Sequence, residues 1–392
     1  RRALKKSRMQ VSLKPNDRVP NRDFVLRYRL ADAQVKTAFM VDRGSHDNTF
    51  ALLLEPPAET RFLQRQPREM IFVVDCSGSM RGRPLDKAKE AMRKCLQHLD
   101  ERDTFQVIRF SSSASQLGPY PLKATPDNVR KGLVHIDQLN SGGGTRMIEG
   151  IKAALDMPQE KNRLRIVSFM TDGFIGNEDE ILAAIHQRLD GARIFSFGVG
   201  NSVNRYLIES MARVGRGAAA FVGLDEGSGR AVDLFYERAA HPALTDLEID
   251  WGGLAVSRVY PKQLPDLFPG RPIMITGTFK GEADGDIVVR GQRGGKVKTF
   301  KVAAQKPGAD HEGIRFVWAR QRMKELNLAN AVRPAAELKN EMIRFSTEHS
   351  VLCNYTAFLA MDSSRITDGN HGFSVHVPVP VPDGVRYETT VK

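Results

Sequence analysis

Cysteine, tryptophan and long hydrophobic runs are all scarce in this chain of 392 residues. The three cysteines are Cys76, Cys95 and Cys353, and their odd number and wide spacing exclude a disulfide framework and a CxxC metal site. No run approaches the roughly 18 consecutive apolar residues that cross a membrane, and no signal peptide is recognisable. The chain starts at Arg1 rather than Met, so we expect a piece of a longer protein whose targeting signals lie elsewhere.

Positive charge exceeds negative charge. The formal net charge is +12, which could favour polyanions or acidic membrane surfaces. The lysines and arginines are scattered, however, and aromatic residues do not interleave with them as they do in nucleic-acid-binding strips. We therefore expect a basic, solubilising surface, no specific nucleic-acid partner, and membrane association only through an anchor outside this part of the protein.

The middle of the chain, about 68–242, alternates short apolar runs with helical patterns. Residues 70–74 read as a strand buried on both faces, and Pro84 suits the first turn of the helix that follows. This alternation predicts an α/β fold, with a doubly wound and mostly parallel sheet that carries helices on both faces. Further strands are expected at 104–110, 164–170, 194–199 and 218–222, and further helices at about 127–139, 146–156, 178–189, 203–214 and 229–239.

Strand-rich sequence lies on both sides of this α/β region, which is therefore inserted between β-rich flanking segments. We expect three domains, at 1–66, 68–242 and 243–392, with both flanks contributing to one β-rich module. The N-terminal flank shows period-2 alternation at 24–30 and an apolar run at 51–54. In the C-terminal flank we expect hairpin turns at Asp284-Gly285 and Gly294-Gly295, helices at about 312–327 and 335–347, a strand at 355–361 and an extended Pro-rich tail at 377–382.

The segment Asp75-Cys76-Ser77-Gly78-Ser79 carries the first candidate ligands. It places one carboxylate and two hydroxyls where a buried strand ends and its loop begins. In open α/β sheets, ligands bind beyond the carboxyl ends of the strands. Gly78 allows the loop to turn tightly, so the side chains of Asp75, Ser77 and Ser79 are expected to converge.

Two further oxygen ligands are expected from later loops. A glycine-rich loop at 141–144 precedes Thr145, and Asp172 follows the strand at 164–170. With the first three, these side chains form an all-oxygen site that has only two formal charges. Such ligands suit Mg²⁺, with Mn²⁺ and Ca²⁺ as alternatives. Because the ion keeps much of its charge, it can accept an Asp or Glu carboxylate from a protein partner.

A purely structural explanation of these residues also exists. Ser77 and Ser79 could cap the helix that follows Gly82, and Asp172 could cap the helix near 178. Cys76 lies within the candidate loop, but thiolates suit softer ions. We expect Cys76 to fill a buried space and not to bind the metal.

The combination of Asp-x-Ser-x-Ser, Gly-Gly-Gly-Thr and Thr-Asp-Gly, in this order, resembles the von Willebrand factor A domain. The resemblance implies a metal-ion-dependent adhesion site formed by Asp75, Ser77, Ser79, Thr145 and Asp172. It also implies a cation-dependent binding function in which the metal engages an acidic residue of a protein partner.

The flanks resemble the inter-alpha-trypsin inhibitor heavy chains, over about 15–382. Residues 19–26 are similar to the end of the VIT domain that precedes the A domain there, so 1–66 would be the C-terminal remnant of a VIT-like domain. Leu267-Phe268-Pro269-Gly270 and Trp318-Ala319-Arg320 are similar to the region that follows it. We suspect a bacterial relative of the sortase-target type, at the cell surface or in the periplasm and membrane-associated in the full-length protein. The Asp-Pro-His-Phe-type motif for covalent transfer is missing, so that activity is not implied.

Two other functional classes remain as alternatives. A Mg²⁺-dependent hydrolase is disfavoured because Asp75 occupies the first glycine position of a Gly-x-Ser-x-Gly elbow. His311-Glu312 also lacks the second His of a zinc-protease helix. An intracellular A-domain scaffold in a multiprotein complex is disfavoured by the resemblance of the flanks. We predict a binding module and not an enzyme.

Overall fold

The computed structural model contains two compact units, 30–357 and a smaller one formed by 1–29 with 358–392. In the smaller unit, β1 (Arg2–Lys5) and β2 (Arg8–Gln10) pair antiparallel. The alternation at 24–30, the helix expected at 229–239 and the tail at 377–382 lie outside the described residues. The structure describes 2–5, 8–10, 35–44, 47–57, 67–160, 163–173, 175–200, 202–224, 242–304 and 311–359.

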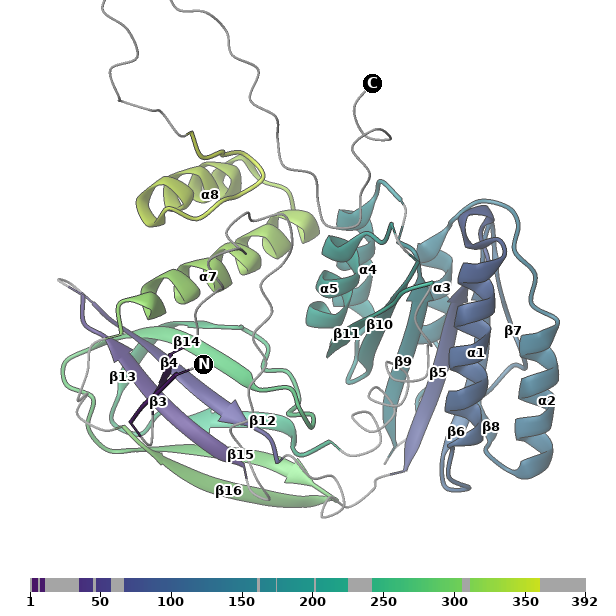
Figure 1. Ribbon diagram of the computed structural model, residues 1–392, viewed down its shortest axis with the longest axis horizontal. Helices are drawn as coiled ribbons and strands as arrows, with labels where there is room; N and C mark the ends of the chain where they lie inside the picture. Colours follow the sequence, from purple (N-terminus) through teal and green to yellow (C-terminus); the bar gives the residue numbers. More distant parts are fainter. Residues whose placement is uncertain are drawn as a thin grey trace, which may run out of the picture. The chain divides into compact units, whose positions relative to one another are not determined.

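A seven-stranded sheet forms the centre of the larger unit (Figure 1), in the order β11-β10-β9-β5-β6-β7, with β8 also paired to β6. Its five long strands run parallel, which confirms the predicted mostly parallel sheet. Two short antiparallel strands, β7 and β8, were not predicted because so few residues show no periodicity. The strands are β5 (Arg68–Asp75), β6 (Thr104–Phe110), β7 (Ala114–Gln116), β8 (Leu122–Lys123), β9 (Leu164–Thr171), β10 (Arg193–Val199) and β11 (Arg216–Val222).

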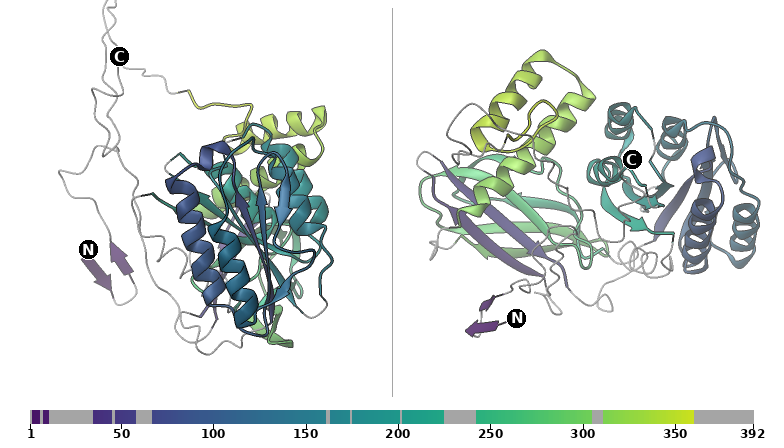
Figure 2. Two further views of the ribbon diagram at one scale, coloured as in Figure 1. Left: turned by 90° about the vertical axis from the view of Figure 1, so that its right-hand side faces the viewer. Right: turned by 45° about the horizontal axis from the view of Figure 1, so that its top comes forward.

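Helices cover both faces of this sheet (Figure 1 and Figure 2), as a doubly wound fold requires. On one face, α1 (Arg83–Gln97) and α2 (Pro126–Asp137) pack against the strands. On the other face lie α3 (Met147–Leu155), α4 (Glu178–Arg188) and α5 (Arg205–Val214).

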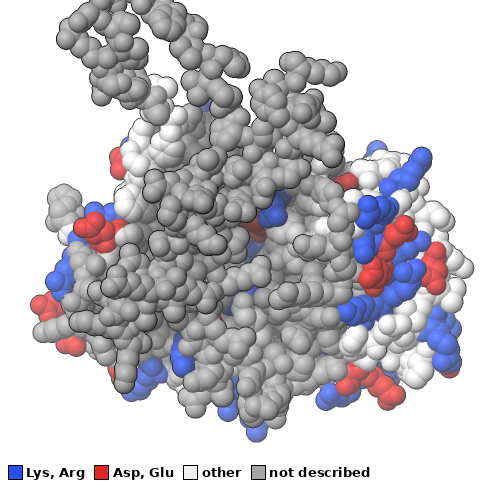
Figure 3. Space-filling view, viewed as in Figure 1, with Lys and Arg blue, Asp and Glu red and all other residues white. Residues whose placement is uncertain are grey.

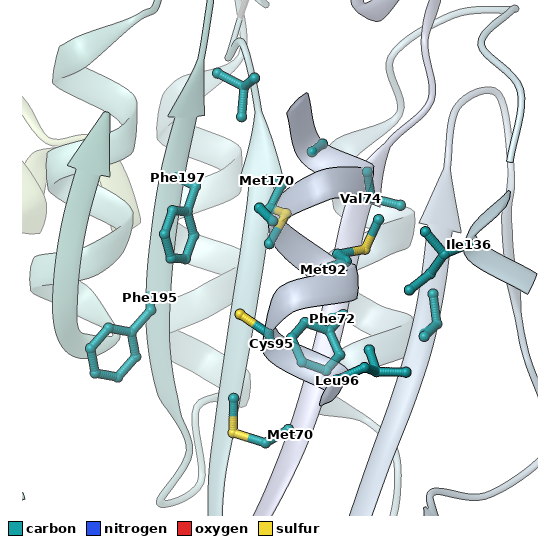
Figure 4. Packing of buried hydrophobic residues seen from close by; sticks show 14 of the residues in the cluster. Met70, Phe72, Val74, Met92, Cys95, Leu96, Ile136, Met170, Phe195 and Phe197 are labelled. Carbon is teal, nitrogen blue, oxygen red and sulfur yellow. The ribbon is translucent and has the colours of Figure 1, made fainter. Parts of the chain in front are cut away.

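The central strand β5 is buried on both sides. Met70, Phe72 and Val74 point toward α1, where they meet residues such as Met92 and Leu96 (Figure 4). The alternate residues of β5 belong to the core on the opposite face. Burial of each large apolar side chain stabilises the fold by about 1.5–3 kcal/mol. The carboxyl end of β5 is therefore held rigidly, and with it Asp75.

Strands from both flanks of the α/β region form two further sheets in the larger unit. The sheet β13-β14-β4-β3 contains strands from both flanks, because β14 pairs with β4. A three-stranded sheet, β12-β15-β16, shares an apolar core with it. These strands are β3 (Lys36–Asp42), β4 (Asn48–Glu55), β12 (Thr245–Asp250), β13 (Ala255–Tyr260), β14 (Ile273–Lys280), β15 (Asp286–Arg293) and β16 (Lys296–Ala303).

Of the two expected hairpin turns, one is present. Gly294-Gly295 joins β15 to β16, which pair antiparallel. Asp284-Gly285 joins β14 to β15, which belong to different sheets. The hairpin prediction there was wrong because a local turn signal does not say which sheet the next strand joins.

The two helices expected after the strands are α7 (Gly313–Val332) and α8 (Ala336–His349). The strand expected at 355–361 is absent over its described residues, 355–359. Tyr355 lies in a turn closed by a hydrogen bond from Thr356 N to Cys353 O (3.2 Å). Phe358 and Leu359 are 68 % and 85 % exposed, so the apolar pattern there faces no sheet.

Charges of both signs intermingle over α1 and α2 on the face shown in Figure 3. Arg93 of α1 pairs with Asp137 of α2 at 2.6 Å, and within α2 Arg130 pairs with Asp127. No helix within the described residues combines the length and apolar character needed to cross a membrane.

Candidate metal centre

Asp75, the last residue of β5, is the most constrained of the expected ligands. Its carboxylate is fully buried. One oxygen, Oδ1, accepts a hydrogen bond from Ser77 N (2.8 Å), and the other, Oδ2, accepts one from Thr171 Oγ1 (2.6 Å). Both oxygens are thus oriented by neighbouring groups.

The two serines lie side by side beyond Asp75. Their hydroxyl oxygens are 3.1 Å apart. Ser77 is buried, whereas Ser79 is exposed within the short 3-10 helix η1 (Gly78–Met80). The pair therefore leads from the buried carboxylate to the solvent.

Backbone hydrogen bonds fasten the glycine-rich loop to the loop after β5. Gly78 N donates to Gly143 O (3.2 Å), and Gly142 N donates to Cys76 O (2.7 Å). Half-buried Thr145 follows directly in this loop. The structure thus brings the loop that carries Thr145 next to the two serines.

The conformation of this second loop requires glycine at one position. Gly143 has a φ of +83°, and a Cβ atom there would lie 2.8 Å from Ser112 Oγ. The same hydroxyl accepts a hydrogen bond from Gly144 N (2.9 Å). Just beyond Thr145, Arg146 N donates to Ser111 O (2.8 Å), so the loop is held at both ends.

Asp172 reaches the same edge because β9 is parallel to β5, with Val74 paired to Met170. It directly follows β9 and is half-buried. Its carbonyl accepts a hydrogen bond from Asn204 N (3.1 Å). The preceding residue, Thr171, bridges the site, because its hydroxyl donates to Asp75 and accepts from Gly173 N (2.9 Å). Sequence reasoning missed this role, and its one signal was a hydroxyl residue at the end of the strand beside β5.

Helix capping does not account for these residues. The N-cap of α1 is Gly82, which follows Ser79 by three residues, and the N-cap of α4 is Asn177, five residues beyond Asp172. Neither helix has a side-chain cap hydrogen bond at that position. The structural alternative is therefore wrong for both helices.

Opposing effects act on the pKa of Asp75. Burial raises the pKa of its carboxyl group, and the neighbouring Asp172 carboxylate raises it further, while hydrogen bonds from Ser77 and Thr171 lower it. No ion pair to Asp75 occurs within the part of the chain that the structure describes. A bound cation would favour the ionised form.

Cys76 points away from these oxygens into the apolar core beneath α1. Burial raises the pKa of its thiol to about 11. The side chain is therefore a neutral thiol near pH 7, and the expectation that it fills a buried space is confirmed.

The donor set as a whole consists of two carboxylates and three hydroxyls. Among the described residues, no group of three or more His, Cys, Asp or Glu side chains is placed to hold a metal ion. An ion at this edge would therefore be held by hydroxyl and carboxylate oxygens together. That chemistry fits a hard cation that keeps some of its water ligands.

Comparison with known proteins agrees with this architecture. Residues 68–221 match the model of the von Willebrand factor type A domain. A solved structure, a von Willebrand factor type A protein from Catenulispora acidiphila, superposes with a TM-score of 0.54 at 14 % identity. The superposition covers 82 % of this chain and 89 % of that one. At this level of identity the likeness shows the fold alone.

Two relatives are similar in sequence. The mouse inter alpha-trypsin inhibitor heavy chain 4 is 24 % identical over 409 aligned residues, 97 % of this chain and 42 % of the relative. A von Willebrand factor A domain-containing protein of Dictyostelium discoideum is 29 % identical over 218 residues, 55 % of this chain and 23 % of the relative. The chain thus spans less than half the length of either relative. Residues 68–221 thus have the fold of a von Willebrand factor type A domain and match its family model, in a chain similar to the inter-alpha-trypsin inhibitor heavy chains.

Proposed function

We propose that this chain is a protein-binding module whose affinity depends on a divalent cation. Asp75, Ser77 and Ser79 bind the ion directly, and Thr145 and Asp172 bind it directly or through water. Mg²⁺ is the proposed ion, with Mn²⁺ and Ca²⁺ as alternatives, because oxygen ligands suit these cations. An Asp or Glu of the partner completes the coordination.

The observation that carries this proposal is the environment of Asp75. Its carboxylate is fully buried and oriented at both oxygens. Burying a charge is costly unless it is paired or coordinates a metal. The adjacent hydroxyls of Ser77 and Ser79 lead from it to solvent, where an ion and a partner can enter.

The chemistry favours binding over hydrolysis. With only two carboxylates beside the dication, the site has no net negative charge to repel a partner carboxylate, which can replace a metal-bound water. The hydroxyls of Ser77 and Ser79 hydrogen-bond to each other. Among the described residues, no histidine hydrogen-bonds to either serine, whereas a serine nucleophile needs an adjacent base.

For the whole protein we propose a surface location and three domains. Residues 1–66 are the remnant of a VIT-like domain, 68–242 the metal-binding domain, and 243–392 a β-rich module with two helices, whose sheet also takes in β3 and β4 of the first segment. Similarity to the heavy chains supports the flanking domains of this proposal. We also propose that the full-length protein is a bacterial surface protein of the sortase-target type. Biotinylation of intact cells with a membrane-impermeant reagent should label the full-length protein. Labelling only after lysis would favour the intracellular scaffold.

Ser79→Ala tests the metal site with little risk to the fold, since this side chain is exposed. Magnesium at 100-fold excess over Kd should raise the stability of the wild type by about 2.7 kcal/mol. The gain should largely disappear in Ser79→Ala and persist in Ser202→Ala, an exposed serine outside the donor set. Calorimetric titration and melting with Mg²⁺, Mn²⁺ and Ca²⁺ provide the measurement. Equal gains in all three proteins would refute the assignment.

A further inference from the structure

Two exposed arginines directly follow the hydroxyl ligands of the proposed site. Arg81 comes two residues after Ser79, and Arg146 comes immediately after Thr145. Because consecutive Cα atoms are 3.8 Å apart, the arginine backbones lie within about 8 Å and 4 Å of those ligands. Two positive charges therefore border the site on the two loops that supply its hydroxyls.

The backbones of both arginines are fixed by hydrogen bonds. Arg81 N donates to Gly78 O (3.2 Å), and Arg146 N donates to Ser111 O (2.8 Å). The two loops are also joined by the bond from Gly78 N to Gly143 O. The arginines thus extend from a stable rim beside the site.

The guanidinium groups of Arg81 and Arg146 have no hydrogen bond or ion pair within the described segments. Other arginines near this edge are engaged. Arg83 donates to Leu224 O (2.7 Å), Arg109 donates to Ser115 Oγ (2.9 Å), and Arg205 stacks on the ring of Phe221 at 4.1 Å.

The Asp172 side of the site has the opposite charge. The loop after Asp172 leads to α4, whose first turn contains Glu178, Asp179 and Glu180. Glu178 accepts a hydrogen bond from Asn204 (2.9 Å), the residue whose backbone binds the Asp172 carbonyl. A second acidic group on a partner would be repelled by α4 and attracted toward Arg81 and Arg146.

We propose that the partner presents an acidic cluster and not a single acidic residue. One carboxylate binds the metal, and its neighbours in the partner chain pair with Arg81 and Arg146. This inference rests on the proposed function and adds the kind of partner sequence, an acidic cluster, that the site binds preferentially. Exposed ion pairs of this kind change affinity modestly, so the two arginines together should tighten binding about three- to tenfold.

The test uses two fluorescent peptides in a Gly-Ser background, one with a single Glu and one with three consecutive Glu. In Mg²⁺, the three-Glu peptide should bind the wild type about three- to tenfold more tightly, by fluorescence anisotropy. In Arg81→Gln/Arg146→Gln the preference should fall below about twofold, while Mg²⁺ affinity stays nearly unchanged. If single-Glu binding is too weak to measure, the three-Glu peptide should bind this variant about three- to tenfold more weakly than it binds the wild type.

The matched control is Lys123→Gln/Lys131→Gln, which removes two exposed charges from β8 and α2. Lys123 pairs with Thr104 at the amino end of β6, at the edge opposite the metal site. The control should keep the full preference. A preference that survives in the arginine variant, or that the control also loses, would overturn the acidic-cluster inference and leave the metal site intact. Three-Glu binding that persists in EDTA, or no Mg²⁺-dependent binding of either peptide, would overturn the proposed function as well.

Discussion

Thr171 shows how one side chain can position a proposed metal ligand without being one. Its hydroxyl donates to Asp75 Oδ2 at 2.6 Å and accepts from Gly173 N, so it connects Asp75 to the loop that carries Asp172. Partners that orient metal ligands typically contribute 10–100-fold to metal affinity.

We therefore expect Thr171→Val to weaken Mg²⁺ binding by about 10- to 100-fold, measured by calorimetric titration. The substitution removes two buried hydrogen bonds, one of them to a carboxylate, and should lower stability by about 2–4 kcal/mol. Thr171→Ser keeps the hydroxyl and should restore most of the metal affinity. Equal affinities in the valine and serine variants would show that the hydroxyl does not position Asp75.

His135 on α2 should make stability depend on pH. Burial lowers the pKa of its imidazole, and the Arg109 charge lowers it further. Its Nε2 is buried and has no hydrogen-bond partner among the described residues. Because the unfolded chain has a His pKa of about 6.5, it binds protons at a higher pH than the folded chain. Stability should therefore fall as pH drops below about 6.5.

The urea midpoint of the wild type should be lower at pH 5.5 than at pH 7.5, and the decrease should be smaller in His135→Leu. The decrease should not vanish, because burial also lowers the pKa of His349. At pH 7.5 the leucine variant should be at least as stable as the wild type, since the unpaired nitrogen is removed. An identical pH dependence in both proteins would exclude His135 as a source of the effect.

At the scale of elements, the loop between α2 and α3 controls where Thr145 lies. Gly143 holds it with a φ of +83°, where a Cβ would meet Ser112 Oγ at 2.8 Å. A left-handed conformation costs a non-glycine residue about 1–2 kcal/mol. At the neighbouring Gly142, a Cβ atom would meet no other heavy atom within 4 Å, and the backbone is not left-handed.

Gly143→Ala should lower the free energy of unfolding by about 1–2 kcal/mol. Relief of the strain by loop movement should also displace Thr145 and weaken Mg²⁺ binding by up to about tenfold, the equivalent of 1.4 kcal/mol. Gly142→Ala is the matched control and should change neither quantity appreciably. Urea unfolding and calorimetric titration measure the two effects, and similar losses in both variants would contradict the role of the left-handed turn.

At the scale of the whole molecule, buried ion pairs connect the central sheet to the strand-rich layers. Arg193 at the start of β10 is 2 % exposed and donates to Asp266 (2.6 Å). The side chain of Asp266, in the segment that joins β13 to β14, is fully buried. Arg216 of β11 also reaches Asp266 (3.2 Å), and Arg193 has a second, more exposed partner in Asp246 (2.8 Å). A ring contact between Phe195 and Phe268 lies alongside.

Asp266→Ala should destabilise the protein by about 3 kcal/mol, the lower end for breaking a buried pair, because Arg193 keeps Asp246 as a partner. Asp286→Ala, which removes the partner of Lys301 in an exposed pair, should cost less than about 1 kcal/mol. In urea we expect the Asp266 variant to unfold in two transitions, the central sheet separating from the strand-rich layers. If Asp266→Ala lowers stability no more than Asp286→Ala does, this ion pair does not couple the central sheet to the strand-rich layers.

The sequence by itself determined the five parallel strands of the central sheet, the order of strands and helices along the chain, and the segments that carry the proposed ligands. Parallel strands buried on both faces appear as continuous apolar runs such as 70–74, and helices appear as 3.6-residue periodicity. Both signals are local. The sequence also predicts that the loops with Asp75 and Asp172 lie close together, because parallel strands end at the same edge of a sheet. That these residues bind a metal remains a prediction.

The tertiary structure decided everything that depends on partners distant in the chain. Asp284-Gly285 reads as a hairpin, but the two strands it joins enter different sheets. No local pattern in β4 or β14 predicts that these two strands pair. The register that places Thr171 beside Asp75 is set by the packing of the whole sheet. Arg193 and Asp266 read as ordinary surface charges in sequence. Their burial follows only from how the layers meet, because desolvation and pairing depend on three-dimensional contacts and not on local pattern.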